Sequence, residues 1–279
     1  MNKYKRKRFL LIYIFIIALA VTAMVSIINC SWSEKPTRDY KDIISDTLKI
    51  VTNLHSLTEL KEINSVSGFD YELAVLIGKE SGMNYKIIIE NSLEKSLKRL
   101  NENKCDIVAR PIIVSAINKN KYLFAGNMRD DKLVLIQRKK EFNNSQSVVE
   151  TPMNLGKKEI HVIDDESIYM IINHLATETG DSIYICKEPK CGVEQLAIMV
   201  ADSVIDYAVG DYSIAKKLSK YLPQIDIKTT VSFSMLHAWG IRKSSPALKD
   251  SLDNWFMRIK ERNEFKNLLN KYNIDPIKQ

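Results

Sequence analysis

The sequence lacks the short motifs that mark most enzyme active sites. It contains no Gly-x-Ser-x-Gly nucleophile elbow, no glycine-rich phosphate loop and no pair of histidines on one helix face. Histidine itself is rare, and the few residues present are scattered along the chain. We interpret them as structural and predict no catalytic residue, no cofactor and no metal site. These histidines are His55, His161, His174 and His237.

Cysteine is also scarce, with four residues in a chain of 279. Cys186 and Cys191 form a Cys-x4-Cys pair, which supplies too few ligands for zinc without a second pair. In an oxidising compartment these two thiols would instead be able to form a disulfide, which leaves Cys105 buried and reduced. The sequence is compatible with both the bridged and the reduced state of the pair.

Acidic residues are absent before Glu34, and this absence accounts for most of the net charge of +7. A basic cluster at the N-terminus carries five of these charges, so the rest of the chain keeps a net charge of +2. A nearly neutral folded part gives no reason to expect a nucleic-acid partner. The cluster consists of Lys3, Lys5, Arg6, Lys7 and Arg8.

One long apolar run, Phe9 to Ile28, comes after this cluster. A run of about 20 apolar residues spans a bilayer as a helix, whereas a cleaved signal peptide has an apolar part of about 7 to 15. Cys30 allows a second interpretation, because it resembles the lipidation cysteine of a bacterial lipoprotein, although Asn29 is larger than that pattern prefers. Both interpretations make residues 1–30 a membrane anchor or lipoprotein signal and residues 31–46 a tether. Both place the remaining chain outside the cytoplasm, so we expect a protein of the cell envelope.

Strands and helices alternate from residue 47 onward, which predicts the α/β class with parallel sheets. A polar stretch around residues 141–151 interrupts this alternation and predicts two lobes. The first part of lobe 1 is assigned to residues 47–138, lobe 2 to 139–231, and the return to lobe 1 with C-terminal helices to 232–279. The predicted strands are 48–52, 85–90, 107–109, 133–137, 160–163, 182–186, 205–209, 225–231 and 236–242, and helices are predicted at 69–81, about 92–100, from about 167, at about 193–201 and beyond Pro246.

Polar residues come after several of these buried strands, where ligands bind in open α/β sheets. Arg110, Ser115 and Asn118 are expected in a loop directly after strand 107–109. Asp211 takes the equivalent place in the second lobe, either as a ligand contact or as the cap of a helix that starts near Tyr212. Charges of opposite sign in the two lobes suit a zwitterionic ligand between them. At the next helix start, Asp165 or Ser167 is expected to cap the helix and to offer a possible anion site.

Four segments of the sequence are informative in combination: Gly68–Ala74, Cys105–Ala109, Ile205–Asp211 and Ala238–Lys243. Together they resemble the family 3 extracellular solute-binding proteins and, more closely, the binding module of membrane-bound lytic murein transglycosylase F. The resemblance extends from about Leu48 to Tyr272. It implies a type II periplasmic-binding-protein (Venus flytrap) fold, with two lobes that hinge strands join and that close over a small ligand.

The resemblance also implies roles for individual residues. Thr52 and Asn53 would line the cleft, Ser115 would contact a ligand carboxylate, and Asp211 would pair with a ligand ammonium group. Asn118 departs from the family, because amino-acid binders carry at that position an arginine that holds the α-carboxylate in a bidentate fork. Either Arg110 takes over the anion, or the ligand is not a free amino acid.

The sequence therefore predicts a non-catalytic, membrane-attached binding or sensing module for a peptidoglycan fragment, a peptide or an amino-acid-like ligand. Two alternatives are open: the substrate-binding component of an amino-acid ABC importer, which implies an ABC permease as partner, and a regulatory remnant of a lytic transglycosylase, which implies a cell-wall enzyme as partner. The resembled transglycosylases add a lysozyme-like domain after the binding module, and we expect no such domain within these 279 residues.

Overall fold

The computed structural model describes residues 12–22, 24, 38–53, 68–143, 147–272 and 274. Residue contacts divide the chain into two units, Met1–Thr37 and Arg38–Gln279. In the first unit, residues 12–22 are helical. Among the residues that the structure describes, none of the helices combines the length and the apolar character needed to cross a membrane. Cys30 and parts of the predicted anchor lie outside the described residues.

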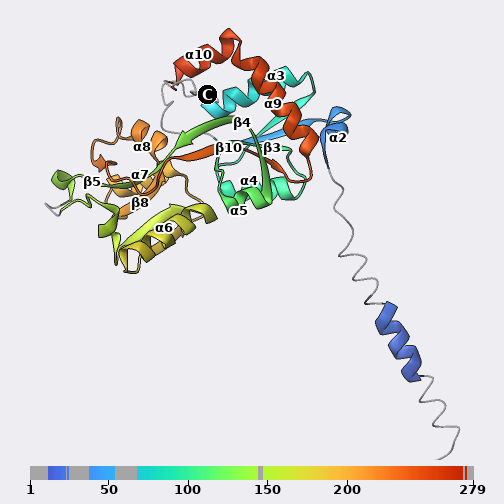
Figure 1. The fold of residues 1–279 in the computed structure, drawn as a ribbon, viewed down its shortest axis with the longest axis horizontal. Coiled ribbons are helices and arrows are strands. Elements are labelled where there is room, and N and C mark those ends of the chain that lie inside the picture. Colours follow the sequence, from blue (N-terminus) through green and yellow to red (C-terminus); the bar gives the residue numbers. More distant parts are fainter. Residues whose placement is uncertain are drawn as a thin grey trace, which may run out of the picture. The chain divides into compact units, whose positions relative to one another are not determined.

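The first sheet of the second unit has five described strands in the order β2-β1-β3-β10-β4 (Figure 1). β1 runs parallel to β2 and β3, and β10 runs antiparallel to β3 and β4. The last strand therefore returns to a sheet that the N-terminal half began. The bounds are β1 Leu48–Thr52, β2 Tyr85–Ile89, β3 Ile107–Ile113, β4 Tyr122–Asp131 and β10 Met235–Arg242.

The second sheet, again counting the described strands, has the order β7-β6-β8-β5-β9. β6 is parallel to β7 and β8, whereas β5 pairs antiparallel with β8 and β9. Two separate α/β sheets confirm the predicted two-lobed α/β class. The bounds are β5 Leu133–Arg138, β6 Glu159–Ile163, β7 Tyr184–Glu188, β8 Tyr207–Asp211 and β9 Ile225–Asp226.

The passage between the sheets differs from the predicted lobe boundary at residue 138. β4 ends at Asp131 in the first sheet and β5 begins at Leu133 in the second, so β5 belongs to lobe 2. β4 itself occupies a segment for which the sequence predicts no strand. The predicted strand 225–231 is shorter in the structure, with β9 ending at Asp226 and an isolated bridge between Val134 and Thr230.

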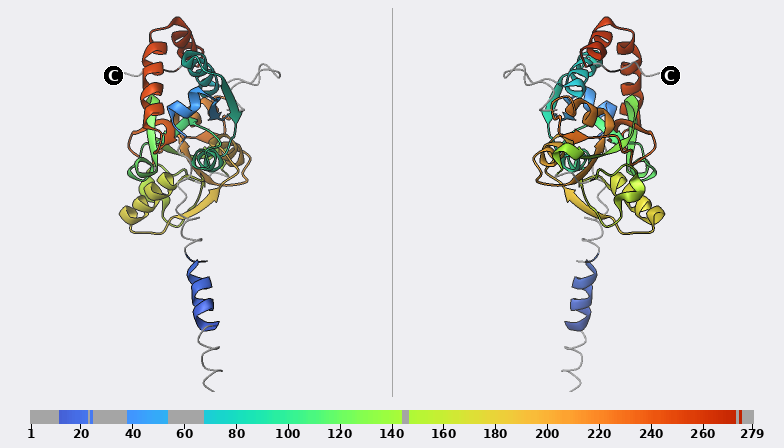
Figure 2. Two further views of the ribbon diagram at one scale, coloured as in Figure 1. Left: turned by 90° about the vertical axis from the view of Figure 1, so that its right-hand side faces the viewer. Right: turned by 90° about the vertical axis from the view of Figure 1, so that its left-hand side faces the viewer.

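Helices cover both faces of the first sheet (Figures 1 and 2). Ile50, Ile107 and Ala109 pack with α3, α9 and α10 on one face, whereas the alternate residues Val51 and Val108 pack with α4 on the other. This alternation is the period-two pattern of buried strands. The helices of this lobe are α2 Tyr40–Ile44, α3 Phe69–Ser81, α4 Leu93–Asn101, α5 Ala116–Lys121, α9 Pro246–Lys260 and α10 Asn263–Lys271.

The second sheet is covered in the same way. Leu133 and Leu135 of β5 pack with α6 on one face, and Val134 and Ile136 pack with α7 and α8 on the other. Two short 3-10 helices, η1 Lys140–Phe142 and η2 Pro152–Leu155, lie in the connection from β5 to β6. The helices are α6 Glu166–Thr179, α7 Val193–Ala201 and α8 Tyr212–Leu218.

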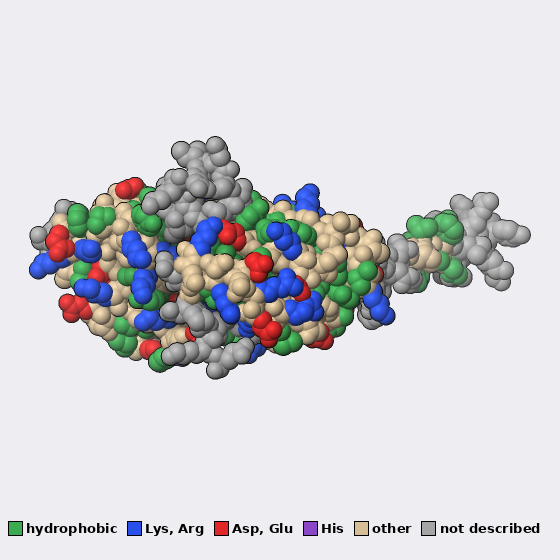
Figure 3. Space-filling model, turned by 90° about the horizontal axis from the view of Figure 1, so that it is seen from above, with side chains coloured by type: hydrophobic (Ala, Val, Ile, Leu, Met, Phe, Trp, Pro, Cys, Tyr) green, Lys and Arg blue, Asp and Glu red, His purple; other side chains and the backbone are tan. Residues whose placement is uncertain are grey.

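The molecular face in Figure 3 carries Lys and Arg side chains interspersed with Asp and Glu side chains. The basic groups on this face do not gather into a single patch of the kind that tracks a phosphate backbone.

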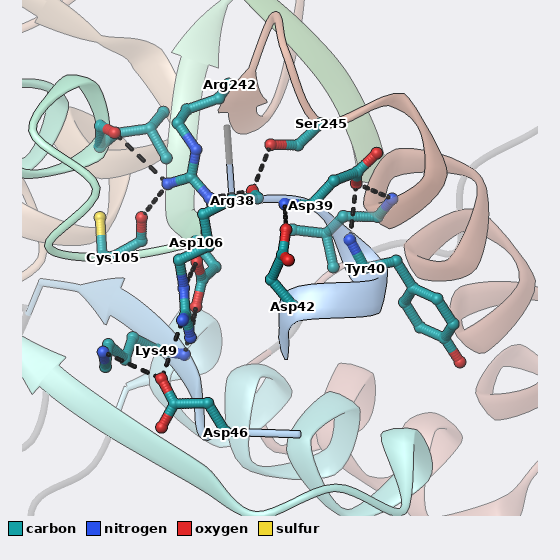
Figure 4. Close-up of polar contacts among 12 residues, drawn as sticks. Arg38, Asp39, Tyr40, Asp42, Asp46, Lys49, Cys105, Asp106, Arg242 and Ser245 are labelled. Atoms are coloured by element: carbon teal, nitrogen blue, oxygen red, sulfur yellow. Dashed lines mark hydrogen bonds and ion pairs between the residues drawn. The ribbon is translucent and has the colours of Figure 1, made fainter. Parts of the chain in front are cut away.

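A buried polar network joins three strands at the base of the first sheet (Figure 4). Asp106 is fully buried and accepts hydrogen bonds from Nε of Arg38 at 2.8 Å, Nη2 of Arg242 at 2.9 Å and the backbone N–H of Lys49 at 2.9 Å. Two guanidinium groups thus balance one carboxylate that would be unfavourable alone in the interior. The network connects the Cys105–Ala109 segment to the Ala238–Lys243 segment through Arg242.

Candidate functional site

A pocket opens where the two lobes meet, and both lobes contribute to its lining. Its position at the ends of buried strands agrees with the general placement of ligand sites in α/β sheets. The charged and amide side chains that line it include Asn53, Arg110 and His237 from the first lobe and Asp165, Glu194 and Asp211 from the second.

Arg110 contributes a guanidinium group to the lining of this pocket. It lies inside β3, which continues to Ile113, so the prediction that Arg110 lies in a loop after a three-residue strand is wrong. Its Nη1 donates to the backbone carbonyl of Asn91 at 3.0 Å, whereas its buried Nε has no hydrogen-bond partner. Burial lowers the pKa of Arg110, and the nearby Glu194 and Asp70 oppose that shift. A buried guanidinium with an unused donor is suited to hold a ligand anion.

The end of β1 contributes one of its two predicted residues to the pocket. Asn53 lines it, and the buried Oδ1 of Asn53 has no hydrogen-bond partner. Thr52 instead donates from Oγ1 to the backbone carbonyl of Ala109 at 2.8 Å and does not line the pocket. Side chains alternate between the two faces of a strand, so these neighbours point in different directions. The role in the cleft that the resemblance implies for Thr52 therefore stays a prediction, and of these two residues only Asn53 lines this pocket.

Three carboxylates of the second lobe line the pocket at the starts of helices. Asp165 caps α6 by accepting from the backbone N–H of Ser167 at 2.8 Å, and burial raises the pKa of Asp165. Glu194 lies in the first turn of α7. Asp211 precedes α8, but its side chain makes no capping hydrogen bond, which excludes the simple capping role. The sequence does not predict Glu194 as a site residue, because no motif marks it.

Asp211 forms an ion pair with His237 across the lobes. Nε2 of His237 lies 3.3 Å from Oδ1 of Asp211, without the alignment of a hydrogen bond. Burial alone would raise the pKa of Asp211, but His237 and the positive charges of Arg129 and Arg110 outweigh burial and lower it. Conversely, burial would lower the pKa of His237, and the contact with Asp211 raises it. The sequence predicts only a structural role for His237, whereas in the structure its side chain also lines the pocket.

The remaining predicted site residues contact one another and do not line the pocket. Ser115 caps α5, and its Oγ lies 2.8 Å from Oγ of Ser167 in the second lobe. Nδ2 of Asn118 donates to the same Oγ at 3.0 Å and to the backbone carbonyl of Ile113 at 2.9 Å. None of these three side chains lines the pocket. Asn118 thus joins the lobes at a place where the sequence predicts a ligand contact.

The sequence allows both states of the cysteine pair, and in this structure Cys186 and Cys191 are both free thiols. Cys191 lines the pocket, while Cys186 donates to Oε1 of Glu159 at 3.1 Å. Burial raises the pKa of Cys105 to about 12, so the third thiol is protonated and unreactive.

Two α/β lobes, a pocket between them and unsatisfied polar groups inside it define the class of two-lobed solute-binding proteins. The chain belongs to the bacterial extracellular solute-binding proteins, family 3, whose model matches residues 49–275. This assignment agrees with the resemblance found in the sequence.

Known proteins similar to this chain include enzymes, carriers and a sensor. Membrane-bound lytic murein transglycosylase F of Cronobacter sakazakii is 22% identical over 280 residues, which cover 97% of this chain and 51% of the relative. The chain thus spans about half the length of that curated relative. Amino acid ABC transporter substrate-binding protein AbpA of Streptococcus pneumoniae, bound to L-arginine, has a TM-score of 0.66 at 18% identity and covers 83% of this chain and 98% of its own. A histidine kinase sensor domain with similarity to periplasmic binding proteins has a TM-score of 0.68 at 11% identity, with coverages of 82% and 98%. Identities this low show the fold alone.

Proposed function

We propose that this protein is a non-catalytic binding or sensing module of the cell envelope that holds a small zwitterionic ligand between its lobes. The unused Nε donor of Arg110 carries the proposal, because a buried cation with a free donor is stabilised by an incoming anion. The carboxylates of Asp165, Glu194 and Asp211 provide partners for an ammonium group on the same ligand. A peptidoglycan fragment, a peptide or an amino-acid-like molecule has both charges.

The ligand of this pocket is not a free amino acid held in the manner expected from the family. Asn118 replaces the expected arginine, and its amide is engaged by Ser167 and the carbonyl of Ile113. Arg110, on strand β3, therefore takes the anion in place of a residue on helix α5. A different position for the anion favours a ligand of different length, such as a muropeptide or a short peptide.

Attachment to the membrane through residues 1–30, by a helix or by a lipid on Cys30, is part of the same proposal. The basic cluster and the apolar run from Phe9 to Ile28 support it, since this order keeps the N-terminus inside and exports the residues after the run. Labelling intact cells with a membrane-impermeant thiol reagent tests the location. The labelled chain carries Cys186→Ser and Cys191→Ser together with a cysteine in place of the exposed Lys190. Protection of that cysteine until the cells are lysed would contradict an exported domain.

Ligand binding is tested by thermal shift and calorimetry on the full chain with two panels, the common amino acids and purified muropeptides. A bound ligand stabilises the folded state, by about 2.7 kcal/mol at a ligand concentration of 100 times Kd. This stabilisation raises the unfolding midpoint. We expect muropeptides or short peptides to raise it. A rise with common amino acids alone would contradict our ligand class and support the alternative, the substrate-binding component of an amino-acid ABC importer.

The third possibility, a regulator of a cell-wall enzyme, predicts that such an enzyme copurifies with the chain. Muramidase activity in the purified protein would overturn the non-catalytic part of the proposal.

A further inference from the structure

His161 and Cys186 lie opposite each other on two neighbouring strands of the second lobe. β6 and β7 are parallel, and their register pairs His161 with Cys186. Side chains two residues apart on a strand point to the same face, so Glu159 joins His161 on β6 and Glu188 joins Cys186 on β7. Four side chains of metal-binding type therefore share one face of the sheet beside its edge strand.

The spacing of three of these groups is that of a ligand set. Oε1 of Glu159 lies 3.3 Å from Nε2 of His161 and 3.1 Å from Sγ of Cys186. The ligand atoms of the three residues all lie within 4.8 Å of one another. Tetrahedral zinc, with bonds of about 2.0 Å to nitrogen and oxygen and about 2.3 Å to sulfur, holds its ligand atoms about 3.3 to 3.5 Å apart. Small side-chain shifts would be enough to bring the three atoms around one ion.

The fourth residue orients the histidine. Nδ1 of His161 lies 3.0 Å from Oε1 of Glu188. A carboxylate at this nitrogen stabilises the Nδ1–H tautomer and leaves the Nε2 lone pair directed toward Glu159. Histidines that bind metals regularly donate their other ring N–H to such a carboxylate. His161 is mostly buried and Glu159 is exposed, so an ion would reach the ligands from solvent.

We propose that Glu159, His161 and Cys186 bind one divalent transition-metal ion, zinc in the first place, with Glu188 as the group that positions His161. The combination of thiolate, imidazole and carboxylate suits zinc better than the hard ions calcium or magnesium. Three protein ligands leave one tetrahedral position for water or an incoming ligand atom, unlike the closed set of four in structural zinc sites. The three ligands do not line the pocket between the lobes, so this site is independent of the solute site.

Binding is tested with the full chain, purified in mild detergent, by calorimetry with Zn²⁺ and by absorption spectroscopy with Co²⁺. We expect one ion per chain and a near-ultraviolet band from thiolate-to-cobalt charge transfer. Cys186→Ser removes this band, and Cys186→Ser and His161→Gln each weaken Zn²⁺ binding at least tenfold. Glu188→Gln weakens binding about 10- to 100-fold, the usual effect of losing an orienting carboxylate, while the charge-transfer band persists.

Matched controls separate this site from casual metal binding. Cys191→Ser removes the other partly exposed thiol among the described residues, and His174→Gln removes an exposed histidine on α6. Both variants keep wild-type affinity for the metal and the cobalt band. Unfolding midpoints measured without metal identify any variant that fails to fold, and Glu159→Gln, at an exposed position, then serves in its place. A wild-type chain that binds neither ion at a ratio of one, or a cobalt band that survives in Cys186→Ser, overturns the proposal.

Discussion

Burial disfavours the charged form of Arg110, and the surrounding carboxylates offset part of that effect. Glu194 and Asp70 are the largest of these opposing influences on its pKa. Its buried Nε has no hydrogen-bond partner. A ligand anion would supply the acceptor that this donor lacks, which is why removal of the side chain should affect binding more than folding.

Arg110→Ala is expected to weaken binding of the ligand identified by the two panels by at least about tenfold. A hydrogen bond to a charged group contributes about 1.5–3 kcal/mol, and tenfold corresponds to about 1.4 kcal/mol. Calorimetry on the purified variant measures the effect. Arg262→Ala is the control, because Arg262 is half exposed and pairs with Glu80 away from the pocket. Equal affinity of the wild type and Arg110→Ala would remove Arg110 from the site.

His237→Gln is expected to make stability less dependent on pH. The pKa of His237 is raised above its ordinary value of about 6.5, so its pair with Asp211 stabilises fully below about pH 6.5 and loses that effect as pH rises through the raised pKa. The contribution of Asp211, whose pKa is lowered, is fully present above its ordinary value of about 3.9 and is lost as pH falls through the lowered pKa.

Unfolding midpoints of the wild type and His237→Gln, measured from about pH 5 to about pH 9, test this sign, because that range brackets the ordinary histidine pKa. The wild type should exceed the variant most at the acidic end, and the difference should shrink toward the basic end. His174→Gln, with an exposed ring, should parallel the wild type throughout. A difference that grows with pH would contradict the ion pair.

At the scale of elements, the sequence predicts the buried strands and the longer helices well. α3 occupies the predicted range 69–81, because Phe69, Leu73 and Ile77 are spaced along one helix face and Gly82 ends it in the left-handed conformation. β4 and α5 are not predicted. β4 is defined by pairing with β10, more than a hundred residues away in sequence, and no local pattern carries that information.

The unpredicted helix α5 also explains why the sequence misplaces Ser115 and Asn118. The sequence predicts a loop for Ser115 and Asn118, whereas Ser115 caps α5 and Asn118 lies within it. In this arrangement their side chains reach across to the first turn of α6, where they meet Ser167. The site residues on correctly predicted strand ends, Asn53 and Asp211, do line the pocket.

Gly126→Ala should destabilise the protein through β4. Gly126 has a φ of +86°, and a Cβ there would lie 2.2 Å from the ring of Phe256 in α9. A left-handed conformation costs a non-glycine residue about 1–2 kcal/mol, and overpacking adds about 1–3 kcal/mol. We expect a loss of about 2–5 kcal/mol in urea denaturation.

Gly180→Ala provides the matched control for that variant. Gly180 has a φ of +69°, but a Cβ there would meet nothing within 4 Å. It should lose only the conformational part, about 1–2 kcal/mol. Equal losses in the two variants would show that the Phe256 contact has no effect.

At the scale of the whole molecule, the Asp106 network connects Arg38, at the start of the second unit, to Arg242 of β10. Asp106→Asn leaves the guanidiniums of Arg38 and Arg242 without their buried carboxylate. Removing one partner of a buried ion pair costs about 3–5 kcal/mol, and we expect a loss in that range from urea denaturation.

Asp46→Asn is the comparison for this prediction. Asp46 also pairs with Arg38, at 2.8 Å, but its side chain is half exposed. Solvent screens such a contact, so this variant should unfold at nearly the wild-type urea concentration. An Asp106→Asn variant as stable as Asp46→Asn would show that the network contributes little.

The strands β5 to β9 form the second sheet and come, in sequence, between β4 and β10 of the first sheet. This order affects which lobe folds first as the chain is synthesised. Every described strand of the second lobe lies between Leu133 and Asp226, so that lobe is complete once this stretch has emerged. The first sheet, by contrast, waits for β10, which inserts between β3 and β4. Domains generally fold as units while the chain grows. The second lobe is therefore expected to fold before the first. Until β10 has been synthesised, the first sheet of the nascent chain lacks the strand that lies between β3 and β4.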